Sequence, residues 1–287
     1  MLKKCLKYDL QSVSRIWWIL AATMMGAALV AALSIRAFFQ ALENSESAGL
    51  MDVLSIFGIL GAGLCLLAMV AGLVISVFLV YWRTYTHFYT DEGYLTFTLP
   101  VKRSTLYLSK VLTSVIVETA TLAVFLVGIG LILLIAPPAD QGELINPMIY
   151  EGLGTVLKEF FGIVKGWPIL WGIALIPTLL ASQLYASGLV FMSMSIGAML
   201  AKKHKLMASI GIYYAITAAV SFVGQFFSAF LSEGIIGVIT TSVKGGGAAF
   251  GLTITAVILI WGLLIACATT VIHFITVHLL EKKLNLA

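Results

Sequence analysis

Six long apolar runs alternate with short polar segments along the 287-residue chain. Each run has about the 20 apolar residues that a helix needs to cross a bilayer. Inside lipid the backbone must satisfy its own hydrogen bonds, and the runs lack the alternation of barrel strands, so we expect helices. The sequence therefore predicts an all-α polytopic membrane protein with six transmembrane helices in a single domain, residues 1–287. The predicted spans cover residues 16–39, 51–85, 105–137, 167–201, 206–232 and 249–280.

Composition supports this prediction. The chain is 61% hydrophobic and 10% charged, whereas soluble domains carry about 25% charged residues. The first run follows several lysines, as in a signal peptide, but it is longer than a signal core and five more runs follow it. We therefore expect a retained first helix. The three cysteines are scattered and show no spacing typical of disulfide frameworks or zinc sites, so no metal site is expected.

The distribution of charge predicts the orientation. Most of the 17 basic residues precede the first run, lie between runs two and three or four and five, or end the chain. Most acids lie in the remaining segments. Because basic residues favour the cytoplasmic side, both termini are predicted to be cytoplasmic, which also requires an even number of spans. The positive net charge then reflects membrane orientation and does not indicate nucleic-acid binding.

The first 15 residues predict an amphipathic helix on the inner membrane surface. Leu2, Leu6, Leu10 and Val13 fall on one helical face, and the lysines fall elsewhere. Such a helix lies in the lipid interface with its basic side chains near anionic headgroups. The alternative is a frayed basic tail, which the apolar spacing makes the weaker interpretation. The residues expected at the membrane surface are Lys3, Lys4, Lys7 and Arg15.

The segment 86–104, called the connector below, is the most polar stretch between two spans. Asp91 is suited to cap a short helix, Glu92 suits its first turn, and Pro100 should end it. Several large apolar side chains are also present, and a plain solvated loop need not expose them. We therefore expect a short cytoplasmic helix that meets a partner.

Two further segments have their own signals. Residues 140–166 include an amphipathic stretch that is too charged to span the membrane, so we expect it on the outer surface. Residues 234–251 are apolar but interrupted by glycines. They are too short for two complete crossings, so they predict re-entrant helices between spans five and six, buried against protein.

Glu118 is the one acid well inside a predicted span, and such residues are functional candidates. His273, Lys110 and neighbouring hydroxyl groups are its candidate partners. A structural hydrogen bond and a role in transport are both compatible with this position. His273 fits a pairing histidine better than a metal ligand, because no cluster of Cys and His accompanies it.

Motifs for catalysis are missing from the sequence. There is no GxxxxGK[ST] phosphate-binding loop, and neither HExxH nor GxSxG occurs. We therefore expect that the chain is not an enzyme and that no cofactor binds to it.

The connector sequence DEGYLTFTLPVKRS, residues 91–104, is followed by LSK at 108–110. Together with the basic N-terminal helix and six spans, it resembles the ABC-2-type permeases of bacterial exporters. The resemblance implies a plasma-membrane (inner-membrane) location, a connector that docks on a separate ATPase, and ATP and Mg²⁺ on that ATPase. It also implies two ATPase copies and a second permease chain, identical or different. The residues that it assigns to ATPase coupling are Asp91, Glu92, Gly93, Tyr94, Leu95, Phe97, Pro100 and Arg103.

The function implied by this resemblance is ATP-driven export of an amphipathic or hydrophobic substrate, such as an antimicrobial peptide, a lipid-linked molecule or a drug. Two alternatives remain open at this point. One is a proton-coupled secondary transporter that uses Glu118. The other is a membrane scaffold or sensor subunit that does not transport.

Overall fold

The computed structural model is helical wherever its secondary structure is regular, and its described part has no strand. Six helices are long and apolar enough to cross a membrane over the residues described, which confirms the predicted all-helical fold with six candidate spans. The structure describes residues 1–43, 50–90, 93, 98, 101–136, 151–152, 154–155, 158, 168–201, 204–244 and 247–282. The helices are α1 (Leu2–Glu43), α2 (Leu50–Tyr89), α4 (Arg103–Ile135), α6 (Pro168–Leu200), α7 (Lys205–Lys244) and α8 (Gly247–Lys282).

The chain divides into two compact units. The N-terminal unit consists of residues 7–82 and 116–156. The C-terminal unit consists of residues 1–6, 83–115 and 157–287. Helices α2 and α4 each contribute to both units, because the division falls within them. The residues on either side of the connector therefore belong to the C-terminal unit, although they continue helices of the N-terminal unit.

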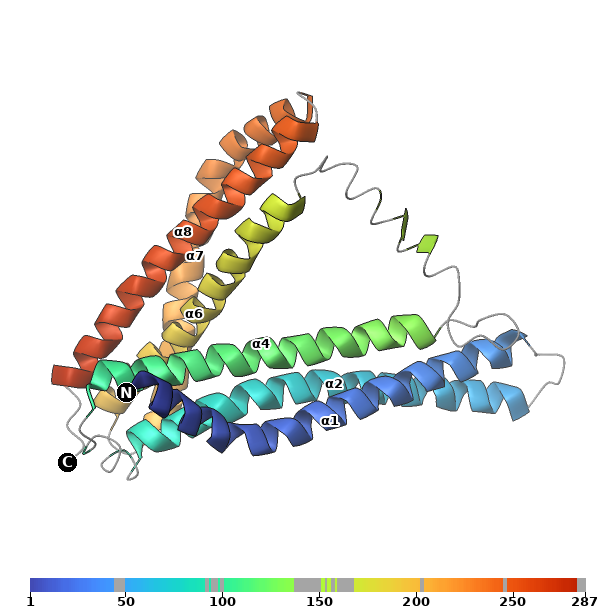
Figure 1. Ribbon diagram of the computed structural model, residues 1–287, viewed down its shortest axis with the longest axis horizontal. Helices are drawn as coiled ribbons and strands as arrows, with labels where there is room; N and C mark the ends of the chain where they lie inside the picture. Colours follow the sequence, from blue (N-terminus) through green and yellow to red (C-terminus); the bar gives the residue numbers. More distant parts are fainter. Residues whose placement is uncertain are drawn as a thin grey trace. The chain divides into compact units, whose positions relative to one another are not determined.

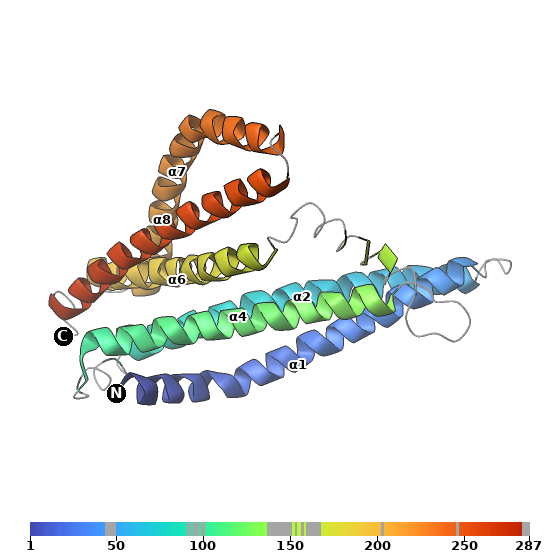
Figure 2. The same cartoon turned by 45° about the horizontal axis from the view of Figure 1, so that its top comes forward.

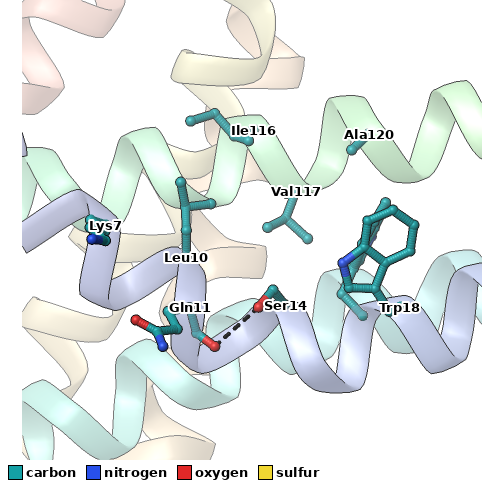
Figure 3. Close-up of a pocket in the computed structure, with 9 residues that line it drawn as sticks. Lys7, Leu10, Gln11, Ser14, Trp18, Ile116, Val117 and Ala120 are labelled. Carbon is teal, nitrogen blue, oxygen red and sulfur yellow. Dashed lines mark hydrogen bonds between the residues drawn. The ribbon is translucent and has the colours of Figure 1, made fainter.

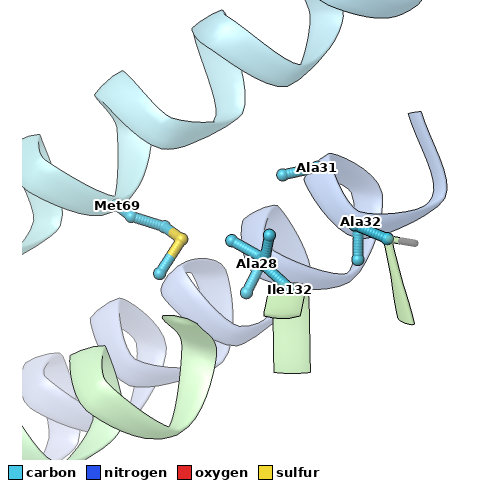
Figure 4. Close-up of a cluster of buried hydrophobic side chains, with 6 residues drawn as sticks. Ala28, Ala31, Ala32, Met69 and Ile132 are labelled. Atoms are coloured by element: carbon cyan, nitrogen blue, oxygen red, sulfur yellow. The ribbon is translucent and has the colours of Figure 1, made fainter. Parts of the chain in front are cut away.

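Helices α1, α2 and α4 lie side by side, and their parts within residues 7–82 and 116–156 form the N-terminal unit (Figures 1 and 2). Their core is built from small residues of α1 and larger ones of α2 and α4 (Figure 4). Ala28 is fully buried in this cluster with Met69 and Ile132. A Cβ atom at Gly128 would lie 2.7 Å from Met69 Cε and 3.3 Å from Ala28 Cβ. Small residues thus allow the three helices to approach closely, as is common between membrane helices.

Helix α6 packs against both α7 and α8 in the C-terminal unit. Leu189 and Met192 of α6 form a buried cluster with Ile272 of α8. Gly197 of α6 lies close to the backbone of α7, because an added Cβ would lie 2.6 Å from the Cα of Ser209. Because backbone atoms occupy that space, only glycine fits at this crossing.

Helices α1 and α7 continue furthest beyond the predicted spans. Helix α1 is continuous from Leu2, so the structure has no helix end at residue 15. The sequence has no Pro or Gly between residues 2 and 25 to interrupt the helix, and its polar residues do not break it. The position of residues 1–15 on the membrane surface stays a prediction, as does the cytoplasmic location of both termini.

Helix α7 continues to Lys244, beyond the predicted end at 232, and α8 begins at Gly247. Figure 2 shows that α7 changes direction toward its C-terminal end. The predicted re-entrant helices over 234–251 stay a prediction. Most of the predicted outer segment 140–166 lies outside the described residues; its described positions 151–152, 154–155 and 158 are helical.

Candidate functional site

Both ends of the connector are attached to helices of the C-terminal unit. Tyr89, the last residue of α2, is buried, and its hydroxyl lies 2.6 Å from the hydroxyl of Ser195 in α6. Arg103, the first residue of α4, donates hydrogen bonds from its guanidinium to the carbonyl oxygens of Leu280 and Glu281 in α8. The chain therefore leaves α2 at a bond to α6 and enters α4 at a bond to α8.

The contact of Arg103 has a clear physical basis. The last four carbonyl groups of a helix lack partners within that helix. They carry partial negative charge, which favours a cation at this end. The planar guanidinium offers several N–H donors at once, so one side chain can serve two successive carbonyls of α8. Arg103 therefore acts as a cap on α8 that is supplied by α4.

Aromatic and basic side chains near these two attachments join α4 to the end of α2. Lys110 is 6% exposed, and its Nζ lies 3.2 Å from Nδ1 of His87. An ammonium group only donates, so the imidazole nitrogen is the acceptor. The same Nζ lies 5.9 Å from the centre of the Phe88 ring, within range of a cation–π interaction. These contacts join α4 to the last turns of α2 and offset the cost of burying the amine.

His273, predicted as an intramembrane polar residue, lies in this region. Its ring centroid is 5.2 Å from that of Tyr107, which is buried. Tyr107 also makes an edge-on contact with Phe191 of α6. His273 thus belongs to a ring cluster that joins α4, α6 and α8.

Gly93 is, besides Arg103, a predicted coupling residue whose surroundings the structure shows. Its N–H donates a hydrogen bond to the carbonyl oxygen of Thr90 at 2.8 Å. A Cβ at this position would lie 2.6 Å from the carbonyl oxygen of Phe88, so a side chain would collide with the end of α2. Apart from Arg103 and Gly93, the predicted coupling residues lie outside the described residues. These are Asp91, Glu92, Tyr94, Leu95, Phe97 and Pro100.

Glu118 forms a hydrogen bond with Tyr81, which is not among its predicted partners. The Tyr81 hydroxyl donates to Oε1 of Glu118 at 2.7 Å, and the site is partly buried. Three residues further along α4, the indole N–H of Trp17 donates to Thr121 Oγ1 at 2.8 Å. Polar groups of α4 thus join it to both α2 and α1 within the N-terminal unit.

The four residues predicted at the membrane surface, Lys3, Lys4, Lys7 and Arg15, are all exposed along α1. Over the described part of the chain, no group of three or more His, Cys, Asp or Glu side chains could hold a metal ion. Tyr89 and Ser195 are not singled out by the sequence, although Tyr89 lies within the connector. Comparisons of the chain with protein-family models, with curated proteins and with solved structures found no match.

Proposed function

We propose that this chain is the membrane permease subunit of an ATP-driven exporter and that its connector docks on a separate ATPase. The observation that supports this proposal most directly is the attachment of both connector ends to α6 and α8. A docking element must pass its displacement to the membrane helices. Tyr89 and Arg103 provide such attachments on either side of the connector.

The lengths of α2 and α4 are compatible with a connector outside the membrane. With 40 and 33 residues, they extend about 60 Å and 50 Å at 1.5 Å per residue. The hydrocarbon core is only about 30 Å thick. Their connector-proximal ends carry polar residues such as Arg83 and His87 on α2 and Lys110 on α4. We therefore place these ends at the cytoplasmic surface, where a soluble ATPase can reach the connector.

In the proposed mechanism, closure of two ATPase subunits moves the connector. The bonds of Tyr89 and Arg103 pass this motion to α6 and α8. Helices α2 and α4 carry it along their length into the N-terminal unit. The chain itself supplies no nucleotide chemistry, since ATP and Mg²⁺ bind to the ATPase.

The low charge of the spans favours an amphipathic or hydrophobic cargo, such as a peptide, a lipid-linked molecule or a drug. We place the transport path between two permease chains. The bond between Tyr81 and Glu118 gives the acid a structural partner. It therefore favours a structural role of Glu118 over a role as proton carrier.

The decisive experiment is reconstitution with a defined ATPase, such as one encoded beside this chain. We expect the ATPase to copurify and cargo to stimulate its hydrolysis in proteoliposomes. Charge reversal of Asp91 and Glu92 to lysine should weaken the association. Glu151→Lys is a matched control, because Glu151 is exposed and lies in the predicted outer segment.

Three outcomes would count against the proposal. Unchanged binding by the Asp91→Lys/Glu92→Lys variant would reject the connector as the docking element. Transport that persists with vanadate and is abolished by Glu118→Gln would favour the proton-coupled alternative. Binding of the ATPase without cargo-stimulated hydrolysis would favour a scaffold or sensor.

A further inference from the structure

A groove of about 500 Å³ lies between α1 and α4 in the N-terminal unit (Figure 3). Pockets for small molecules have volumes of roughly 300–1,000 Å³. The residues of α1 recur at the spacing of one helical face, and so do those of α4. The groove is lined by Lys7, Leu10, Gln11, Ser14, Trp17, Trp18, Ile116, Val117 and Ala120.

The groove is polar at one end and apolar at the other. Lys7 and Gln11 are four residues apart, so they lie one above the other on the same face of α1. Among the labelled groove residues in Figure 3, Lys7 lies at one end and Trp18 at the other, near Ala120 of α4. From Lys7 to Trp18, α1 rises about 16 Å. An amphiphile that follows α1 would therefore meet a cation and an amide first, and rings and aliphatic side chains afterwards.

The two tryptophans have different surroundings. The indole N–H of Trp17 is bonded to Thr121 Oγ1, which fixes this ring against α4 as a wall of the groove. Trp18 is 66% exposed, and its ring meets that of Trp17 edge to face at a centroid distance of 5.1 Å. Trp18 therefore offers an open ring surface along which a hydrocarbon chain can lie. Tryptophan is typical of the level where headgroups meet acyl chains.

The charge of the residues that line the groove indicates which headgroup an amphiphile bound there would carry. Lys7 is exposed at the polar end, and none of the nine described residues that line the groove is acidic. The side chain of Gln11 is also exposed and provides N–H donors beside Lys7. Ser14 donates its hydroxyl to the carbonyl of Gln11 at 3.1 Å, so it contributes acceptor capacity at the transition to the apolar end. A lysine and an amide together favour a phosphate that carries net negative charge.

We propose that this groove binds one anionic phospholipid. Its phosphate lies at Lys7 and Gln11, and one acyl chain follows Trp18 and Ile116. The remaining part of the lipid continues into the surrounding bilayer, because the groove is too small to enclose it. This inference is independent of the ATPase partner and of the cargo.

Quenching of tryptophan fluorescence by brominated lipids tests the proposal on the full-length chain. The chain has six tryptophans, so the signal of Trp18 is taken as the difference between each protein and its Trp18→Phe derivative. Brominated phosphatidylglycerol should reach half-maximal quenching at about fivefold lower mole fraction than brominated phosphatidylcholine. This factor follows from the attraction of one basic side chain to anionic lipid.

Variants separate the groove from general surface attraction. Lys7→Gln should remove the preference for phosphatidylglycerol, whereas Lys4→Gln should keep it, because Lys4 is exposed on the same helix but does not line the groove. Ala120→Phe should fill the groove and weaken quenching by both lipids. If Ala120→Phe disturbs folding, Lys7→Gln still tests the proposal, because Lys7 is exposed and its substitution should not affect the fold.

Four outcomes would overturn the proposal. Equal quenching by the two lipids would indicate a groove for any acyl chain. Equal loss of preference in Lys4→Gln and Lys7→Gln would indicate diffuse attraction to the membrane surface. Competition by glycerol phosphate would indicate a site for free anions. Displacement of both lipids by a hydrophobic cation at equimolar concentration would indicate a drug site.

Discussion

The guanidinium of Arg103 binds the carbonyl oxygen of Leu280 across a sequence separation of 177 residues. Through this contact the first turn of α4 caps the last turn of α8. The bond ties the end of the connector to α8.

Replacement of Arg103 by alanine should expose the C-terminal end of α8. Loss of the cation and its hydrogen bonds should cost about 1–3 kcal/mol, because charge-assisted bonds to the last carbonyls disappear. Amide exchange followed by mass spectrometry should show faster exchange in the last turns of α8. Arg103→Lys should recover part of the protection. The neighbouring change Lys102→Ala should leave exchange in α8 close to that of the wild type, and equal acceleration in both variants would contradict the assignment.

Tyr81→Phe should destabilise the N-terminal unit by about 1–3 kcal/mol, since it leaves the partly buried carboxyl of Glu118 without its donor. Glu118→Gln should cost less, because its amide oxygen can still accept. A double-mutant cycle of Tyr81→Phe with Glu118→Leu, which removes the acceptor, should give a coupling energy of about 0.5–3 kcal/mol when measured by thermal unfolding in detergent. Tyr8→Phe is the matched control at an exposed tyrosine. Additive effects of the two substitutions would show that the bond contributes nothing.

Gly197→Ala should destabilise the packing of α6 on α7 by about 1–3 kcal/mol. The new methyl group would collide with backbone atoms of Ser209, which cannot rotate away as a side chain can. Gly211→Ala is the control in α7, because nothing lies within 4 Å of its added Cβ. That change should be neutral or stabilising by up to about 1 kcal/mol, as alanine is the better helix former. Thermal unfolding of both variants in the same detergent gives the comparison.

The predicted orientation can be checked by cysteine labelling. Lys4→Cys and Glu151→Cys are introduced singly into a chain whose three native cysteines are replaced. Basic residues favour the cytoplasmic side, so a membrane-impermeant maleimide should label Glu151→Cys in intact cells and Lys4→Cys only after disruption. The reverse pattern would invert the topology, and labelling of both from outside would require an even number of spans between them.

The helices could be predicted because lipid imposes a simple rule. A long apolar run must satisfy its backbone internally, and this rule gives six helices without knowledge of any contact. The same rule does not predict the residues at which these helices begin and end. Helix α1 runs back through Lys7 and Lys3 because polarity does not stop a helix where no Pro or Gly interrupts it. Helix α7 likewise continues through Gly234 and Gly237 to Lys244.

The partners of polar side chains could not be predicted in the same way. Glu118 binds Tyr81, 37 residues away on a neighbouring helix, and this choice depends on the rotation of α2 against α4. The sequence does not contain that angle. Arg103 binds backbone oxygens, which no pattern of side chains reveals. The one available signal is general: every helix end has free carbonyls, and a nearby arginine can reach them.

The order of biosynthesis gives the connector attachments a further meaning. Tyr89 is made 106 residues before Ser195, and Arg103 is made 177 residues before Leu280. At 5–20 residues per second, the ribosome needs roughly 9–35 s to complete the second interval. Until Leu280 is made, the Arg103 end of the connector has no attachment, whereas Tyr89 gains its partner earlier, at Ser195. A chain truncated before α8 would therefore carry a connector attached only at Tyr89, so a partner that requires both attachments would bind finished chains and ignore unfinished ones.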